Sequence, residues 1–193
     1  DVRLRGDTAL IEHAVRLGDL DPNQSVVVDP AELADAFETL EADDRAALVR
    51  MAQRVERFAR AQLASMRPLT IDVPGGHAGH RIAPVERAGC YAPGGRYPLP
   101  SSVIMTAPVA RTAGVEDVWL ASPRPSKAVL AAAHISGVRQ MLRVGGAHAI
   151  AALAYGTDTV PACDAIVGPG NRWVSAAKRL VAGDVAIDML AGP

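Results

Sequence analysis

Residues 138–171 read VRQMLRVGGAHAIAALAYGTDTVPACDAIVGPGN, and this stretch decides the fold class. Residues 138–144 predict a strand that ends at a glycine pair, and residues 148–155 predict a helix that stops at Gly156. Residues 165–167 predict a second strand. A strand followed by a helix and then another strand favours a parallel pair of strands, because the helix can serve as the crossover that a parallel connection needs.

The same alternation continues on both sides of this stretch. Apolar periodicity predicts helices at 103–113, 126–136 and 174–182, and strands at 118–120 and 185–190. Repeated units of this length predict an α/β fold: an open, mostly parallel sheet with helices on its faces, Rossmann-like but incomplete. We expect this domain to span residues 91–193.

The first ninety residues have a helical pattern followed by a glycine-rich turn. A helix is predicted from Ala9 to near Gly18, a second from Pro30 to Leu40, and a long amphipathic helix over 41–65. For the second helix, Asp29 is the expected N-cap and Glu32 completes a capping box. Two short strands, residues 69–73 and 81–85, are predicted to flank the glycine-rich residues 75–79.

Composition excludes several classes of function. The chain of 193 residues has 49% hydrophobic residues, and its 20 Lys and Arg against 21 Asp and Glu give a net charge of -1, without the basic excess that nucleic-acid binding demands. Cys90 and Cys163 form no CxxC pair, so we expect two buried thiols rather than a disulfide or a zinc site. His77 and His80 form an HxxH among glycines with no third ligand nearby, so we expect no metal there.

The sequence also indicates where the protein is found. No apolar run approaches the ~18 to 20 residues that cross a bilayer, and residues 1–7 do not resemble a signal peptide. We therefore expect a cytoplasmic protein without membrane contact.

Two glycine turns follow predicted strands and precede predicted helices. In open parallel sheets, ligands lie beyond the carboxyl ends of the strands, where helix N-termini present free N–H groups to anions. Gly145-Gly146 and Gly168-Pro169-Gly170-Asn171 occupy such places, although neither is a GxGxxG or P-loop motif and each could serve only to turn the chain. Asn171 could cap the following helix or donate its amide to a ligand, and the Tyr91 ring could pack inward or lie against an adenine.

Four ordered segments together resemble histidinol dehydrogenase, and the resemblance covers essentially the whole chain. The segments are VRLRGDTAL (2–10), GCYAPGGRYPLPSSVIMTAPVARTAGV (89–115), VGGAHAIAALAYGTDTVPACDAIVGPGNRWVSAAK (144–178) and AIDMLAGP (186–193). The resemblance implies a homodimeric, zinc-dependent enzyme that uses two NAD molecules to oxidise L-histidinol through the aldehyde to L-histidine, the last step of histidine biosynthesis.

The resemblance also assigns roles to individual residues. Tyr91 and Asn171 match residues that contact NAD, and Ser101 matches a serine near the substrate pocket. His148 takes a cofactor-binding position that is commonly glutamine. An imidazole lacks the paired donor and acceptor of an amide, so the departure weakens that contact.

The family's zinc ligands and its catalytic glutamate and histidine lie beyond the AGP at 191–193. We therefore expect this chain to be a truncated, N-terminal portion that holds no catalytic residue and no metal ligand and is inactive alone. By the same analogy, residues 1–90 belong to a second α/β domain. Two alternatives remain open: a related dehydrogenase of another small polar alcohol such as sulfopropanediol, or a non-catalytic nucleotide-binding or dimerising fragment.

Overall fold

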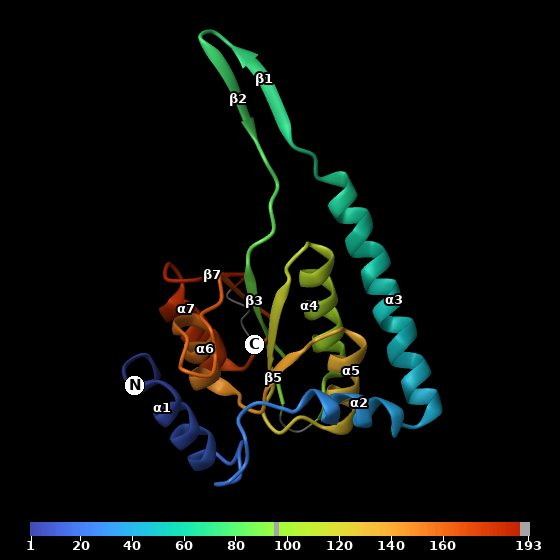
Figure 1. Cartoon of the computed structure of the whole chain (residues 1–193), viewed down its shortest axis with the longest axis vertical. Helices are drawn as coiled ribbons and strands as arrows, with labels where there is room; N and C mark the ends of the chain where they lie inside the picture. The colour runs from blue at the N-terminus through green and yellow to red at the C-terminus, as the bar shows by residue number, and fades with distance from the viewer. Residues whose placement is uncertain (95–96, 190–193) are drawn as a thin grey trace.

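The protein is described by a computed structural model that covers residues 1–94 and 97–189. Its centre is a sheet of five parallel strands in the order β5-β4-β3-β6-β7 (Figure 1). The strands are β3 (Arg87–Tyr91), β4 (Asp117–Ala121), β5 (Gln140–Leu142), β6 (Ala165–Val167) and β7 (Ala186–Ile187). The predicted α/β fold with an open parallel sheet is confirmed.

Helices cover both faces of the sheet, as the sequence predicts. One face carries α2 (Pro30–Glu38), α3 (Ala42–Ser65), α4 (Pro100–Thr112) and α5 (Lys127–Ile135), and the other carries α1 (Val2–Arg16), α6 (Gly146–Tyr155) and α7 (Arg172–Val181) (Figure 1). Each face has its own core of buried apolar side chains. The N-terminal helices therefore pack on the sheet, while the division into domains at residues 90 and 91 stays a prediction.

Two predicted helix starts differ in detail from the structure. The Asp29 side chain accepts the Ala31 N–H at 2.8 Å, which confirms the N-cap of α2, but Glu32 pairs with Arg143 on the sheet and does not form the predicted capping box. The first helix begins at Val2 and not at Ala9. Gly6 interrupts it with φ 53° and ψ −133°, so the glycine that suggested a helix start marks a kink.

The central strand of the sheet, β3, was not predicted from the sequence. Residues 87–91 read RAGCY and have few of the branched side chains that signal a strand. Small residues are required here because β3 is buried between helices, and a Cβ on Gly89 would press against the side chains of Leu153 and Cys163. The strand is therefore specified by close packing on both faces, which has no local sequence pattern.

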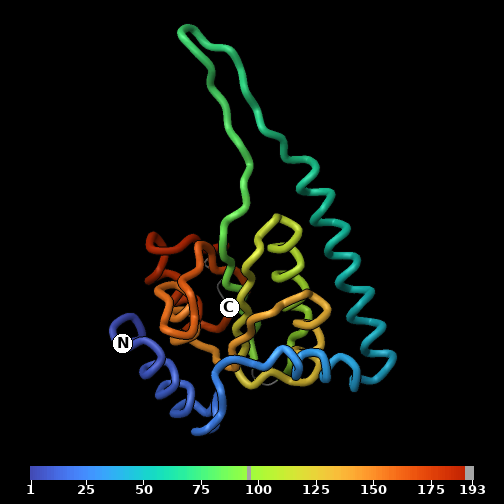
Figure 2. Tube along the Cα trace, viewed as in Figure 1, coloured from blue at the N-terminus to red at the C-terminus, as the bar shows by residue number. Residues whose placement is uncertain are grey.

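A two-stranded antiparallel hairpin extends from the body at the end of α3. Its strands are β1 (Leu69–Val73) and β2 (Gly76–His80), which project away from the body (Figure 2). Every residue of both strands is exposed. The prediction of a second strand at 81–85 was wrong, because the tight turn at Gly75, with φ 88°, places the glycine-rich residues in the strand itself. His77 and His80 both lie on this exposed hairpin and contact Asp72 and the Arg67 carbonyl.

The remaining elements follow the predictions with shifted ends. The last predicted strand, 185–190, is reduced to β7, and Leu190 lies outside the described residues. Cys90 and Cys163 are buried free thiols as expected, and burial raises the pKa of each to about 12. Within residues 1–94 and 97–189, no helix is both long and apolar enough to cross a membrane.

Candidate functional site

The predicted site residues lie at the edge of the sheet where the strands have their carboxyl ends, which we call the carboxyl edge. Strands β3, β4 and β5 follow one another outward, and the chain then returns to place β6 on the other side of β3. This reversal makes the gap between β3 and β6 the topological switch point, the usual ligand position in such sheets. Tyr91 ends β3, His148 lies in the first turn of α6, and Asn171 precedes α7.

The Tyr91 side chain packs inward. Tyr91 is 2% exposed, and its hydroxyl oxygen accepts the Gly146 N–H at 3.0 Å. Burial raises the pKa of the Tyr91 hydroxyl, opposed by the Gly146 hydrogen bond. Of the two positions that the sequence left open for this ring, the structure shows the inward one.

The amide groups before α6 already have partners within the protein. Gly145 N–H donates to the Asp19 carboxylate at 3.0 Å, and Gly146 N–H donates to Tyr91. Asp19 reaches this turn because the segment after α1 runs along the end of β5, where Val28 N–H donates to the Met141 carbonyl at 2.8 Å. Of the two readings that the sequence left open for these glycines, the structure favours a tight turn of the chain, and no local pattern links Asp19 to a turn 126 residues later.

The turn after β6 is held in the same way. Gly168 N–H donates to the Asp188 carboxylate at 2.7 Å, and the Gly168 carbonyl accepts from Lys178 Nζ at 2.9 Å. Lys178 is 2% exposed and forms an ion pair with Asp188. Gly168 has φ 117°, and a Cβ there would lie closer than 3.0 Å to the Tyr91 backbone. The turn is therefore fixed against β3 by Lys178 and Asp188, neither of which was predicted as a site residue.

Asn171 caps α7. Its Oδ1 accepts the N–H groups of Trp173 at 3.0 Å and Val174 at 3.1 Å, and the residue is exposed. These two bonds fix the orientation of the carboxamide. Its Nδ2 is the donor atom that remains for a ligand, because the part of the chain that the structure describes gives it no hydrogen bond.

His148 is the least satisfied of the predicted residues. It is 6% exposed, and its Nε2 is buried without a hydrogen-bond partner. The same atom lies 3.5 Å from Asp19 Oδ2, close enough for attraction only when the imidazole is protonated. A buried polar atom without a partner is uncommon and marks a place where a further group could bind.

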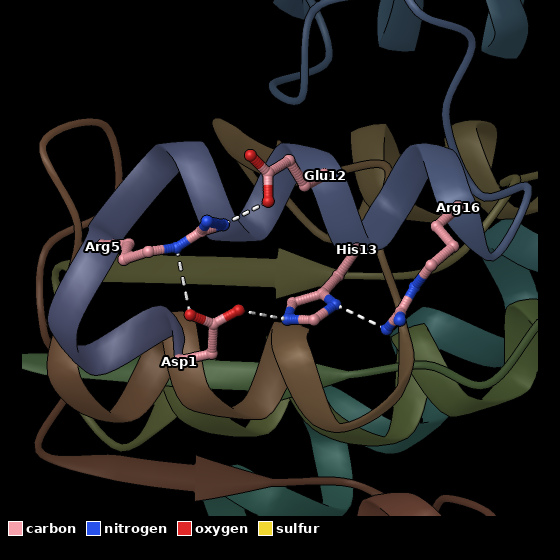
Figure 3. Close-up of polar contacts among 5 residues, drawn as sticks. All are labelled: Asp1, Arg5, Glu12, His13 and Arg16. Atoms are coloured by element: carbon pink, nitrogen blue, oxygen red, sulfur yellow. Dashed lines mark hydrogen bonds and ion pairs between the residues drawn. The ribbon is translucent and has the colours of Figure 1, made fainter.

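A polar network of five side chains lies along α1 (Figure 3). The His13 ring is 6.1 Å from the His148 ring, and its two nitrogens contact Asp1 at 3.0 Å and Arg16 at 2.8 Å. Arg5 joins the Asp1 carboxylate to Glu12 on the outer surface of the helix. Partial burial, with the charge of Arg16, lowers the pKa of His13 and favours its neutral form next to His148.

Ser101 lies apart from these contacts, in the first turn of α4, where it is half-buried. The loop between β3 and α4 includes Gly95 and Arg96 of the GGRYPL segment, which lie outside the described residues, as do residues 190–193 of the AIDMLAGP segment. Among residues 1–94 and 97–189 there is no group of three His, Cys, Asp or Glu side chains that could hold a metal ion. Zinc does not fit the described side chains.

Comparisons with known proteins agree with this architecture. A family model described as "Histidinol dehydrogenase" matches residues 1–193. The chain is 45% identical over 199 residues to a histidinol dehydrogenase of Neisseria gonorrhoeae and 45% identical over 199 residues to one of Chromobacterium violaceum. Each alignment covers 100% of this chain and 46% of the relative, so the chain spans about half the length of these proteins.

A solved structure is similar over the same extent. The crystal structure of histidinol dehydrogenase from Elizabethkingia anophelis matches with a TM-score of 0.90 and 31% sequence identity, and the match covers 100% of this chain and 46% of that one.

Proposed function

Because the chain belongs to the histidinol dehydrogenase family, we propose that it is the coenzyme-binding portion of an NAD-dependent oxidoreductase of histidine biosynthesis. The intact protein would oxidise L-histidinol through the aldehyde to L-histidine. One observation carries the proposal: the family match extends over every residue of the chain. When bound, NAD would take the hydride from the alcohol carbon.

The carboxyl edge suits a coenzyme that is held by side chains. Asn171 has its carboxamide oriented by the cap, with Nδ2 left to donate, and His148 Nε2 is a buried atom that lacks a partner. Tyr91 would act through its ring edge and through the turn that it holds, because its hydroxyl already accepts the Gly146 N–H. The backbone amides of Gly145, Gly146 and Gly168 do not suit a diphosphate cradle, because Asp19, Tyr91 and Asp188 occupy them.

We propose that the groups that carry out alcohol oxidation belong to the intact protein. Alcohol oxidation needs a base for the hydroxyl proton and usually a cation beside the developing alkoxide. The family resemblance assigns these roles, and the zinc site, to a part of the protein beyond this sequence. The 193-residue chain would then bind coenzyme without turning over histidinol.

Calorimetric titration of the chain with NAD tests the proposal. We expect binding in the wild-type chain and at least tenfold weaker binding in Asn171→Ser, because serine lacks the amide donor. Serine is nearly as good an N-cap as asparagine, so the thermal stability of this variant should stay close to that of the wild type. Asn171→Ala, which loses both the amide donor and the N-cap, should lower both the affinity for NAD and the thermal stability. Absence of binding at millimolar NAD would refute the coenzyme role.

The assembly is a second part of the proposal. We infer that the intact protein is a homodimer and lies in the cytoplasm. The hairpin supports the homodimer. Leu69, Ile71 and Val73 alternate along β1 and are all exposed, which leaves an apolar face that another chain or segment can cover. Light scattering should give a dimer mass, and replacing these three residues with Ser should reduce it to a monomer mass.

A further inference from the structure

Lys178 and Asp188 form a buried ion pair to which the proposed function assigns no role. Lys178 lies on α7, and Asp188 comes directly after β7. The Lys178 side chain is 3% exposed, the lowest value of any lysine or arginine that pairs with a carboxylate in residues 1–94 and 97–189. Lysine is almost never buried so completely unless it is paired, so its position here calls for an explanation.

Stability alone does not explain such a pair. Removing two charges from water costs about as much free energy as their mutual attraction returns, and apolar residues in the same place often leave a protein as stable or more stable. An ion pair with hydrogen bonds supplies direction instead, because each bond fixes where its partner lies. The function of the pair is therefore to be found in the groups that its hydrogen bonds hold.

The pair holds both backbone groups of Gly168, the first residue of the turn after β6. Lys178 Nζ donates to the Gly168 carbonyl at 2.9 Å, and Asp188 Oδ2 accepts the Gly168 N–H at 2.7 Å. Asp188 Oδ1 accepts from Lys178 and also from the Met189 N–H at 2.7 Å. Two side chains therefore join α7, the turn after β6 and the chain that leaves β7.

These contacts determine where Asn171 lies. Asn171 ends the turn that Gly168 begins, and it caps α7. The turn also packs closely on α7, because a Cβ on Gly170 would lie less than 3.0 Å from the Val174 side chain. Lys178 follows Asn171 by seven residues, which is two turns of helix on the same face. By holding Gly168, Lys178 fixes the helix and its capping residue relative to the sheet.

We propose that Lys178 and Asp188 are positioning residues that orient the Asn171 carboxamide toward the coenzyme. Neither residue contacts the coenzyme, and both act through Gly168. Without the pair, the turn and the start of α7 take several positions, and NAD binds to the fraction of chains in which Asn171 Nδ2 is correctly placed. The inference rests on the proposed coenzyme function and adds to it two residues that the family resemblance left without a role.

A variant that neutralises both members of the pair tests this role. Lys178→Met combined with Asp188→Asn keeps side chains of similar length, and asparagine can still accept the Gly168 N–H. We expect this neutral-pair variant to bind NAD about fivefold more weakly or worse in calorimetric titration, while it melts close to the wild type. The matched control is Arg87→Met with Asp117→Asn, which neutralises a 3.2 Å ion pair at the opposite edge of the sheet. The control should bind NAD like the wild type.

Combination with Asn171→Ser shows whether the pair acts through Asn171. If it does, adding Asn171→Ser to the neutral-pair variant should bind NAD no more weakly than Asn171→Ser alone, because the contact is already lost. A purely structural role would make the two losses multiply. Multiplied losses, or equal NAD affinity in the wild type and the neutral-pair variant, would overturn the proposal.

Nuclear magnetic resonance gives a readout that does not need the coenzyme. The side-chain amide signal of Asn171 is identified by its absence from the spectrum of Asn171→Ser. It should shift or broaden in the neutral-pair variant and stay in place in the control, and an unchanged signal in the neutral-pair variant would overturn the positioning role. If Asn171→Ser weakens NAD binding and the neutral-pair variant does not, the proposed function stands and the positioning role falls. If the wild type does not bind NAD, the proposed function fails, and this spectrum still decides whether the pair orients Asn171.

Discussion

The hydroxyl of Tyr91 is the acceptor for a backbone N–H at the start of α6, and Tyr91 is buried in the core. Tyr91→Phe would leave the Gly146 N–H buried without a partner. We expect a loss of about 1 to 3 kcal/mol in the free energy of unfolding, measured by urea denaturation. Tyr155→Phe is the control, because the Tyr155 hydroxyl donates to Asp184 at the surface, where water can replace it. A Tyr91→Phe chain as stable as the control would contradict the buried contact.

Glu32 makes stability depend on pH. Its hydrogen bonds with Arg143 hold the pKa of the Glu32 carboxyl below its ordinary value, against the opposing effect of burial. The unfolded chain therefore takes up this proton at a higher pH than the folded chain does. The contribution to stability is complete above the unfolded pKa and is lost as the pH falls through the lowered folded pKa.

Unfolding free energies of the wild type and Glu32→Gln across acidic pH measure this effect. The advantage of the wild type should be constant near neutrality and shrink in the acid range. Glu38→Gln serves for comparison, because that carboxylate is 70% exposed and 3.6 Å from Arg45. A gap between wild type and Glu32→Gln that does not change with pH would show that the pair contributes nothing through protonation.

At the scale of elements, the turn glycine Gly168 differs from Gly183 in what surrounds it. Gly168 and Gly183 both have positive φ, 117° and 106°, but a Cβ at Gly183 meets nothing within 4 Å, whereas one at Gly168 meets the Tyr91 backbone. Gly183→Ala should cost about 1 kcal/mol from conformation alone. Gly168→Ala should cost upwards of about 3 kcal/mol or prevent folding, as thermal denaturation of both variants would reveal. Similar melting temperatures would mean that the turn can move away from β3.

The elements that the sequence predicted well are those whose patterns are local. The long helix, the helices on the sheet and strand β6 follow apolar periodicity, and Asp29 caps α2 as expected. Strand β3 was missed because its small residues are required by neighbours far along the chain. The predicted site residues do lie at the carboxyl edge, yet the partners of their turns, Asp19, Lys178 and Asp188, have no local signature. Side-chain contacts across 126 residues cannot be read from spacing.

At the scale of the whole molecule, the hairpin is a segment of the described chain that packing does not protect from proteolysis. Isolated two-stranded hairpins are marginal in water, and every residue of both strands here is exposed. Brief trypsin treatment should first cut after Arg81, which is exposed beyond β2, while Arg67 should resist because Pro68 follows it. Fragments 1–81 and 82–193 should elute together from a sizing column, since α1, α2 and α3 pack against α6, α5 and α4.

Arg81→Gln should delay this first cut and leave the later pattern unchanged. Early cleavage within α3, at Arg50 or Arg54, would instead indicate that the long helix frays before the hairpin does.

The two buried cysteines can report how often the folded chain opens. Each thiol is buried with a pKa of about 12, so near neutral pH it is neither ionised nor within reach of an alkylating reagent. One lies in the middle strand and the other just before the strand next to it, so both become reactive only when the centre of the sheet comes apart. Pulses of iodoacetamide read by mass spectrometry should therefore add two adducts together or none, and the rate of that paired step would report how often the whole chain opens.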